Sequence, residues 1–219
     1  MRVLITNAAT PLGQTLAEKL GHTHQLRLTD DDTVTTDREF VQSELDHDEA
    51  TDALVANIDA IVHLAYAPRP GDDETAWLDH NSRRLYNLLI AASETSIKRV
   101  IVLSTLELFT PYNDDLPVGN HWKPLPSCEP AVLGAHLAEF TAREFAHSHA
   151  LKVSVARIGH LVRSAEVAGQ PFDPLWLDER DLAPTIERIL EKIGSEGDSQ
   201  YSATHILSDP DRFSKEVNG

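Results

Sequence analysis

The first 13 residues, MRVLITNAATPLG, constrain the fold of this chain more than any other stretch. Val3–Ile5 predict a short buried strand and residues 6–10 a loop of small side chains. Pro11 then predicts the first turn of a helix, a position that favours proline because its missing N–H is not needed there. A strand, a tight loop and a helix in this order are typical of the first unit of a doubly wound α/β sheet.

The same alternation continues along the chain. Further strands are predicted at 25–29, 60–64, 99–103, 152–157 and 201–207, and helices at 11–20, 49–57, 74–93, 130–150 and 181–193. Strands that are apolar along their whole length and alternate with helices indicate a parallel sheet covered on both faces. We therefore expect one α/β domain over residues 1–219, built on a Rossmann-like doubly wound parallel sheet.

Two long segments, at about 107–128 and 158–180, carry no predicted helix or strand in most of their length. The first is rich in Pro, Asn and Asp and also contains Tyr112, His121 and Trp122. Irregular segments of this length in compact domains are usually functional. We expect both of them to form the walls of a ligand pocket.

Composition excludes several classes of protein. The formal net charge of −16 argues against a nucleic-acid groove or an anionic membrane surface, because both need clustered Lys and Arg. No apolar run approaches the roughly 20 residues of a membrane span. The single cysteine, Cys128, excludes an internal disulfide and suits a reducing cytoplasm, where we expect the protein to reside.

The loop after the first strand is a degenerate version of a dinucleotide-binding pattern. Where G-x-x-G-x-x-G would place three glycines, the chain has Asn7, Thr10 and Gly13. Asn7 is a tolerable substitute, because asparagine adopts the left-handed conformation more readily than other residues with a side chain. Thr10 carries a branched side chain where backbone and pyrophosphate should meet. Alternatively, Thr10 caps the helix that begins at Pro11 and no ligand is involved.

Asp30 ends the second predicted strand, where an acidic residue can bond the adenosine ribose hydroxyls of a dinucleotide. A carboxylate there favours NAD over NADP, because it would repel the 2′-phosphate of NADP. Asp31 and Asp32 follow directly, so an acidic surface turn explains the same residues equally well.

Several stretches in this order resemble the extended short-chain dehydrogenase/reductase family, the NAD-dependent epimerase/dehydratase group. They are residues 1–13, Asp30, SEL at 43–45, DAIVHLA at 59–65, Asn81 with YNLLIAA at 86–92, KRVIVLST at 98–105 and ARIG at 156–159. Within that group, LRLTD at 26–30, LYNL at 85–88 and RIG at 157–159 look most like uronate dehydrogenases.

The resemblance implies a small C-terminal lobe beside the sheet and an NAD or NADP cofactor across the strand ends. It also implies hydride transfer on a sugar, sugar-acid or nucleotide-sugar type ligand, and a homodimer formed by the helices at 74–93 and 130–150. The residues implied in cofactor binding are Asn7, Thr10, Pro11, Leu12, Gly13, Asp30, Glu44, Leu64 and Ala65. Glu44 stands where the family commonly has an Asp.

The chemistry of the family depends on a Ser or Thr and on a Tyr-x-x-x-Lys pair. Thr105 matches the Ser/Thr, but Val132 and His136 stand at the Tyr and Lys positions, and no tyrosine in the chain has a lysine four residues later. His136 could act as a lone acid or base, since imidazole titrates near neutral pH, or it could be an ordinary helix residue. Tyr112 or His121 could supply a proton instead.

Other candidate residues leave further alternatives open. Arg157 and Arg163 flank the second pocket segment and could bind a carboxylate or phosphate, or could be ordinary surface arginines. The pairs His22/His24 and His147/His149 each follow a helix end and lack a completing partner, so no metal site is expected. Three interpretations remain. The first is an oxidoreductase with reduced or altered activity, and the second is a non-catalytic, dinucleotide-responsive binding or regulatory module. The third is a structural relative that binds no ligand.

Overall fold

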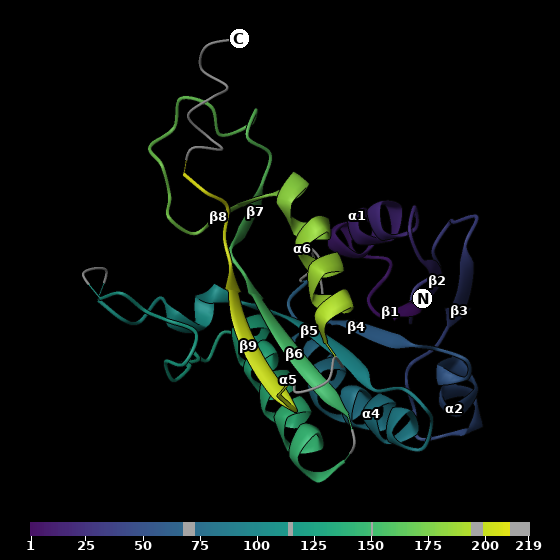
Figure 1. Ribbon diagram of the computed structural model, residues 1–219. Coiled ribbons are helices and arrows are strands. Elements are labelled where there is room, and N and C mark those ends of the chain that lie inside the picture. The colour runs from purple at the N-terminus through teal and green to yellow at the C-terminus, as the bar shows by residue number, and fades with distance from the viewer. Residues whose placement is uncertain (68–72, 114–115, 150, 194–198, 211–219) are drawn as a thin grey trace.

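A computed structural model describes residues 1–67, 73–113, 116–149, 151–193 and 199–210 (Figure 1). Seven parallel strands form one sheet in the order β3-β2-β1-β4-β5-β6-β9. These strands are β1 (Arg2–Ile5), β2 (Gln25–Asp30), β3 (Glu39–Gln42), β4 (Ala60–Leu64), β5 (Arg99–Thr105), β6 (Lys152–Ile158) and β9 (Tyr201–Ile206). The predicted Rossmann-like doubly wound sheet is confirmed.

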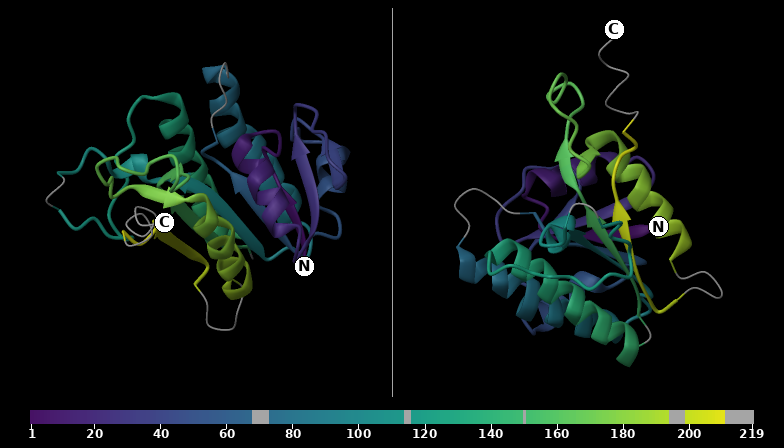
Figure 2. Two further views of the ribbon diagram at one scale, coloured as in Figure 1. Left: turned by 90° about the horizontal axis from the view of Figure 1, so that it is seen from above. Right: turned by 90° about the vertical axis from the view of Figure 1, so that its left-hand side faces the viewer.

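Helices cover both faces of this sheet, as the view from above shows (Figure 2). On one face α1 (Pro11–Leu20) and α6 (Glu179–Lys192) pack on side chains that include Val3, Ile5 and Leu103. On the other face α2 (Glu49–Val55), α4 (Leu85–Ser93) and α5 (Pro130–Ser148) pack on the alternate side chains, such as Leu4 and Val102. Because successive strand residues point to opposite faces, each apolar strand feeds both cores, which explains why the strands are apolar throughout.

The structure adds elements that the sequence pattern did not predict. β3 is an edge strand of half-exposed residues, so it lacks the apolar run that reveals a buried strand. In the segment expected to be a loop, β7 (His160–Val162) and β8 (Trp176–Asp178) form a second, two-stranded sheet. A short 3-10 helix, η2 (Leu106–Phe109), follows β5. Elements of three or four residues are too short to produce a periodic signal.

The predicted helix at 74–93 is one continuous rod with a change of winding in its middle. α3 (Glu74–Asp79) passes into a π-helical turn, η1 (His80–Arg84), and then into α4. A π turn inserts an extra residue into the helical repeat and shifts which side chains face inward. Here it leaves both His80 and Asn81 buried against the sheet.

The strand order reverses between β1 and β4. The chain runs outward from β1 to β2 and β3 on one side, and from β4 to β5, β6 and β9 on the other. In open α/β sheets, ligands bind outside the carboxyl ends of the strands at such a switch point. The carboxyl ends of β1, β2, β4 and β5 therefore mark where a site should lie.

A buried ion pair fastens α5 to the sheet. The Arg157 guanidinium on β6 donates to Glu139 on α5 through Nε (3.0 Å to Oε1) and Nη2 (2.8 Å to Oε2), and the two side chains are 5% and 4% exposed. A third donor, Nη1, reaches the Asn120 carbonyl at 3.1 Å, and the guanidinium lies over the Phe109 ring. Two-point contact of this kind is the strong form of the pair.

Removing one partner of this pair should cost more than removing both. We expect Arg157→Met to lower the free energy of unfolding by about 3–5 kcal/mol, because it leaves the Glu139 carboxylate buried without its cation. The double variant Arg157→Met/Glu139→Leu should regain most of that loss. Urea unfolding at pH 7 measures both values, and a loss of under about 1 kcal/mol in the single variant would contradict this account.

Across the described ranges, no helix combines the length and the apolar character needed to cross a membrane.

Candidate functional site

The loop between β1 and α1 is a closed turn tied to the neighbouring strand. Asn7 adopts the left-handed conformation (φ 52°), as its residue type predicts. Its carbonyl accepts from the Thr10 N–H (3.2 Å) and from the Thr10 hydroxyl (2.7 Å), which closes the turn. The Asn7 side-chain amide donates to the Leu64 carbonyl at the end of β4 (3.0 Å). The loop is thereby fixed at the switch point of the sheet.

Gly13 is required by the close approach of α1 to this loop. A Cβ at position 13 would lie 2.4 Å from the Asn7 carbonyl oxygen and 2.8 Å from the Cα of Ala8, both of them backbone atoms. No other residue type fits without moving the helix. The one glycine that survives from the three-glycine pattern is therefore the one that packing demands.

Thr10 is the N-cap of α1, as the alternative reading of the sequence proposed. Its Oγ1 accepts from the Gly13 N–H (3.0 Å), its backbone is extended, and the residue is 1% exposed. Pro11 begins the helix and Leu12 is buried against the core. Since Thr10 occupies the Gly13 N–H and Pro11 has none, the helix start offers fewer free N–H groups than a three-glycine loop does.

Asp30 is built into the same loop and is not part of a simple exposed turn. It is 4% exposed; its Oδ2 accepts from the Ala9 N–H (2.8 Å) and its Oδ1 from the Asp32 N–H (3.0 Å). Arg84 donates to the adjacent Asp31 (2.7 Å). Beside this corner opens a cavity of about 760 Å³, lined by Ala8, Ala9, Gln14, Ala17, Glu18, Leu28 and residues 33–38.

The remaining cofactor residues predicted from the sequence take different positions. Leu64 and Ala65 are buried at the end of β4, and the Leu64 carbonyl holds Asn7. Glu44, by contrast, is exposed. The adjacent Leu45 is buried in its place, in the left-handed conformation (φ 52°), and its carbonyl accepts from the Asn87 side chain (2.9 Å).

Thr105 closes β5 at the predicted edge of the sheet, with a hydroxyl held in a fixed place. Its Oγ1 accepts from the Glu107 N–H (3.1 Å). Its side chain interacts with the Tyr66 phenol, which extends from the turn after β4. Sequence reasoning examined Tyr66 only for a following lysine and missed this contact. A tyrosine directly after a buried parallel strand was the available signal.

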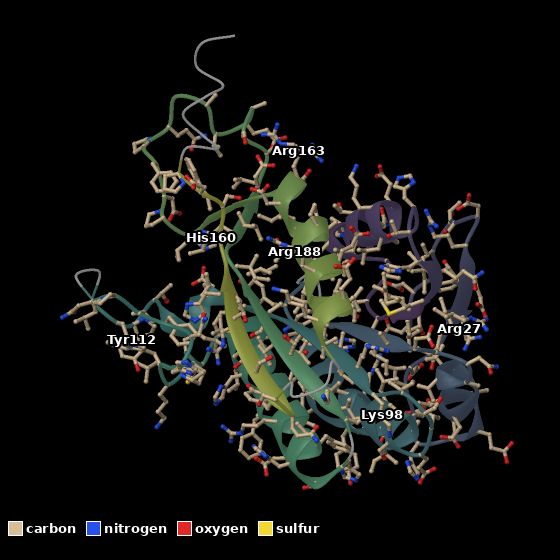
Figure 3. All side chains as sticks on the ribbon, in the orientation of Figure 1. Arg27, Lys98, Tyr112, His160, Arg163 and Arg188 are labelled. Atoms are coloured by element: carbon tan, nitrogen blue, oxygen red, sulfur yellow. The ribbon has the colours of Figure 1, made fainter. Side chains whose placement is uncertain are left out.

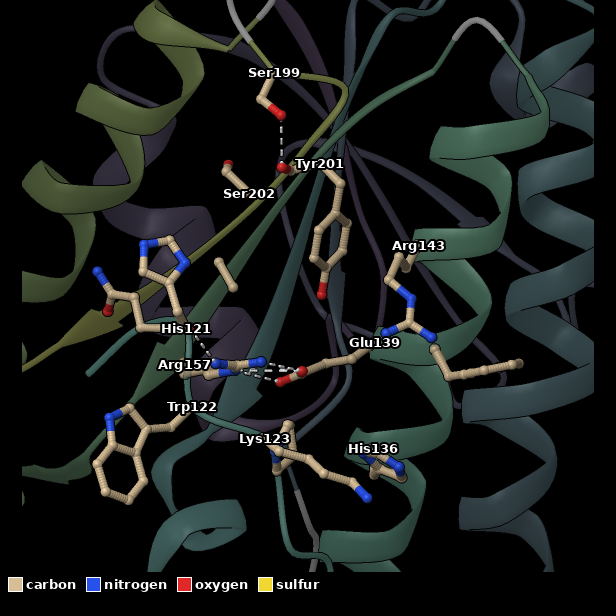
Figure 4. Close-up of a pocket in the computed structure, with 14 residues that line it drawn as sticks. His121, Trp122, Lys123, His136, Glu139, Arg143, Arg157, Ser199, Tyr201 and Ser202 are labelled. Atoms are coloured by element: carbon tan, nitrogen blue, oxygen red, sulfur yellow. Dashed lines mark hydrogen bonds and ion pairs between the residues drawn. The ribbon is translucent and has the colours of Figure 1, made fainter. Parts of the chain in front are cut away.

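His136 lies elsewhere. It lines a cavity of about 780 Å³ together with Lys123, Arg143 and Tyr201 (Figure 4). Burial lowers the pKa of His136, and its Nδ1 is buried without a hydrogen-bond partner among the described residues. Burial also raises the pKa of Tyr201 to about 12. Thr105 is not among the residues that line this cavity.

Val132, at the tyrosine position of the family, lies in a small apolar cluster with Leu106, Leu108 and Phe109. The two alternative proton donors are also accounted for. The Tyr112 hydroxyl donates to the Lys123 carbonyl (2.8 Å) on the outlying loop, and His121 lines the 780 Å³ cavity (Figures 3 and 4). Of the first pocket segment, residues 120–124 do form a cavity wall.

Both arginines that the sequence offered as ligand-binding residues have carboxylate partners in the structure. The donors of Arg157 hold Glu139 and the Asn120 carbonyl, so its buried charge is already neutralised. Arg163 directly follows β7 and is exposed. It donates to Glu179 at the start of α6 (2.9 Å) and to Glu166 (3.3 Å) (Figure 3). A strongly acidic chain leaves few arginines without a carboxylate partner.

A stack of aromatic rings joins β4 to the helix that begins at Glu74. The buried His63 ring on β4 stacks on His80 (4.8 Å between centroids), which stacks on Trp77 (5.9 Å). The His63 Nδ1 lies 3.0 Å from the Thr6 hydroxyl, which also accepts from the Leu64 N–H. Burial lowers the pKa of His63 to about 4, with Asn81 acting in the opposite direction, so the ring is neutral at pH 7.

Within the described ranges, one group of three or more potential metal ligands lies close together, the carboxylates of residues 30–32. Neither of the histidine pairs, His22/His24 or His147/His149, belongs to it.

Fold and site together define a class of protein. A doubly wound parallel sheet with a tight loop, a required glycine and a buried acid at its switch point is a Rossmann-like α/β protein. Over residues 3–174 the sequence matches the NAD dependent epimerase/dehydratase family. The chain belongs to this family.

The chain is also similar to individual known proteins. The L-arabinose 1-dehydrogenase (NAD(P)(+)) of Haloferax volcanii is 27% identical over 242 aligned positions, which cover 97% of this chain and 90% of that protein. A uronate dehydrogenase variant from Agrobacterium tumefaciens, complexed with NAD, superposes with a TM-score of 0.77 at 24% identity over 94% of this chain and 77% of its own. The protein MoeE5, in complex with UDP-glucuronic acid and NAD, gives 0.73 at 18% identity over 95% and 77%.

The neutral His63 should make the fold sensitive to acid. The unfolded chain binds a proton at His63 near pH 6.5 and the folded chain only near pH 4, so stability is full above pH 6.5 and falls between these values. We expect a loss of about 2 kcal/mol from pH 7 to pH 5. Urea unfolding at both values should show a smaller loss in His63→Asn; equal losses would show that His63 is not the group responsible.

Proposed function

We propose that this protein binds a nicotinamide dinucleotide at the carboxyl ends of β1, β4 and β5. We further propose that it acts as an oxidoreductase on a sugar, sugar-acid or nucleotide-sugar type ligand. Membership of the family supports the cofactor class. The relatives support the ligand class, since they include an L-arabinose dehydrogenase, a uronate dehydrogenase and a protein in complex with UDP-glucuronic acid.

The observation that carries the proposal is the β1–α1 loop. Its turn at Asn7 and the close contact at Gly13 bring bare backbone and the positive end of the ten-residue helix α1 to the switch point. The residues fit a pyrophosphate in this respect. The cap at Thr10 removes one N–H donor, so we expect weaker binding than a three-glycine loop provides.

Asp30 supports a preference for NAD over NADP. Its carboxylate is held in place by the Ala9 and Asp32 N–H groups, next to the loop that would carry the phosphates. A carboxylate at the end of the second strand is placed to bond ribose hydroxyls, and its negative charge opposes a 2′-phosphate.

The chemistry must differ from that of the family. A bound nicotinamide dinucleotide supplies hydride transfer, while the protein must orient the ligand and move a proton. Thr105 provides a hydroxyl fixed by the Glu107 N–H. Val132 cannot exchange a proton, and His136 faces another cavity. We therefore infer that activity is reduced or uses an acid/base from another element.

A second function is favoured by one observation. Val132 is packed into an apolar cluster, which indicates that the tyrosine position has become part of the core. A non-catalytic module that binds the dinucleotide and responds to it would need no proton transfer. Measured binding without turnover would identify this function.

We infer that the described chain is one domain and that two copies form a homodimer through α4 and α5. The last strand and helix belong to the same sheet and core as the first ones, which supports a single domain. On α4 and α5, Tyr86 (50%) and Phe140 (51%) are unusually exposed for large apolar side chains. Large exposed apolar groups often mark a protein contact.

Calorimetric titration with NAD, NADH and NADP tests the cofactor proposal. We expect NAD to bind more tightly than NADP. Asp30→Asn should weaken NAD binding about tenfold, because a charge-assisted hydrogen bond contributes about 1.5–3 kcal/mol. It should also narrow the difference between the affinities for NAD and NADP. Asp32→Asn, a change of the same type at an exposed neighbour, is the control and should leave the affinity within about twofold. If none of the three dinucleotides binds the wild type, both functions are wrong.

Light scattering tests the homodimer. The double variant Tyr86→Glu/Phe140→Glu should halve the mass observed for the wild type, because carboxylates would have to be buried at the contact. Phe172→Glu, at a similarly exposed apolar residue outside α4 and α5, should not change the mass. A wild type that is monomeric at high concentration would exclude the homodimer.

A further inference from the structure

Tyr66 lies in the turn after β4, beside the end of β5. The N–H groups of Ala65 and Tyr66 both donate to the Leu103 carbonyl of β5 (2.9 and 3.1 Å). Because Leu103 precedes Thr105 by one full strand repeat on the same face, the Tyr66 backbone is fixed beside the end of β5. This is the carboxyl edge of the sheet, at the strands next to the switch point.

The side chain of Tyr66 fills the space around the missing family tyrosine. Its ring is half-buried and packs against the cluster of Leu106, Leu108, Phe109 and Val132. Its phenol lies beside the side chain of Thr105 and interacts with it. In the family, the phenol beside this threonine belongs to the Tyr-x-x-x-Lys pair, whose position in this chain is on α5, whereas here the tyrosine comes from the turn after β4.

The charges around Tyr66 differ from those beside a tyrosine with a neighbouring lysine. Burial, together with the Glu107 and Glu129 carboxylates, raises the pKa of Tyr66, and the hydrogen bond with Thr105 acts in the opposite direction. Glu129 is held nearby as the N-cap of α5, accepting from the Val132 N–H (2.8 Å). Tyr66 is therefore a neutral phenol at pH 7.

His160 moderates one of these carboxylates. Its Nε2 contacts Glu107 at 2.5 Å and its Nδ1 contacts Asp173 at 3.3 Å. Burial lowers the pKa of His160, but these two contacts outweigh burial and the pKa is raised overall. Protonated His160 would offset part of the effect of Glu107 on the phenol below neutral pH.

We propose that Tyr66 is the catalytic acid/base of this protein, with Thr105 as the hydroxyl that positions the reacting oxygen. The inference rests on the proposed oxidoreductase function. It assigns the proton transfer to a residue in the turn after β4 and not to a residue on α5. Val132 can therefore stand at the tyrosine position of the family without loss of proton transfer.

The proton and electron balance of the step is simple. For oxidation of a sugar hydroxyl, the Tyr66 phenolate would take the proton of the C–O–H group, and a bound oxidised nicotinamide would accept the hydride released when the C–H bond breaks. The carbon–oxygen bond becomes a carbonyl. Tyr66 then passes its proton to water, so that one proton is released for each turnover.

The environment of Tyr66 also sets a pH dependence. Oxidation needs the phenolate, which is scarce at pH 7 because the pKa of Tyr66 lies above its ordinary value of about 10. The oxidation rate should therefore rise about tenfold per pH unit between pH 7 and pH 9. Carbonyl reduction uses the neutral phenol as proton donor and should lack this rise.

Substitution of Tyr66 tests the assignment, with glucuronate and L-arabinose as substrates and NAD as cofactor. Tyr66→Phe should lower kcat for oxidation by at least about 100-fold, the range for general acid–base catalysis, with KM and calorimetric NAD affinity within about threefold. The slope of rate against pH should disappear. Tyr112→Phe is the matched control: it alters another tyrosine packed on the same apolar cluster and should keep both rate and slope.

A spectroscopic readout is independent of turnover. In protein labelled with ¹³C at tyrosine Cζ, the NMR signal that Tyr66→Phe removes should stay at the shift of the protonated phenol through pH 9. Thr105→Val should raise the pKa of the Tyr66 phenol further, since the substitution removes the Thr105 hydroxyl whose interaction lowers that pKa. Thr105→Ser should restore it.

The outcomes separate this inference from the proposed function. If the wild type binds and reduces NAD but Tyr66→Phe retains its rate, the assignment of Tyr66 is wrong and the oxidoreductase function stands. If NAD binds and neither sugar is oxidised at any pH up to 9, Tyr66 is not an acid/base and the binding module is correct. If no dinucleotide binds, both the function and the assignment fail.

Discussion

The site depends on the way three strand ends are tied together at the switch point of the sheet. Asn7 joins the end of β1 to β4 through the Leu64 carbonyl, and Asp30 joins β2 to the same loop through the Ala9 N–H. Gly13 then lets α1 approach to contact distance. These three contacts fix the loop. They therefore hold the N-terminus of α1 in a fixed position at the carboxyl edge of the sheet.

Loss of two glycines has been compensated within the loop itself. Asn7 takes the left-handed conformation that the first glycine would supply, and Thr10 caps the helix with a hydroxyl that the second glycine lacks. The compensation stabilises the fold, since an N-cap contributes about 1 kcal/mol. It also occupies a donor that a phosphate would use, so stability of the loop and affinity for a dinucleotide are set against each other.

The carboxyl edge of the sheet shows a similar replacement between residues that are distant in the sequence. On α5, Val132 has joined an apolar cluster, Gly134 leaves room for Trp77 and Asn81, and Glu139 holds Arg157 in the core. Each of these residues serves the packing of α5 on the sheet. The phenol beside Thr105 comes instead from the turn after β4, as Tyr66. A parallel sheet permits this exchange because neighbouring strands end at one edge.

The sequence by itself determined the alternating architecture, the family, the loop at Asn7–Gly13 and the acid at Asp30. All of these depend on local patterns or on an ordered series of short motifs. Short or edge elements such as β3, β7 and β8 have too few residues for a pattern, and the π turn at 80–84 keeps the composition of an ordinary helix. Only the tertiary structure decided that Tyr66 lies beside Thr105, that His136 lines a separate cavity, and that Arg157 is paired with Glu139. Such contacts follow from strand order and side-chain direction, which join residues distant in the chain and leave no local signal.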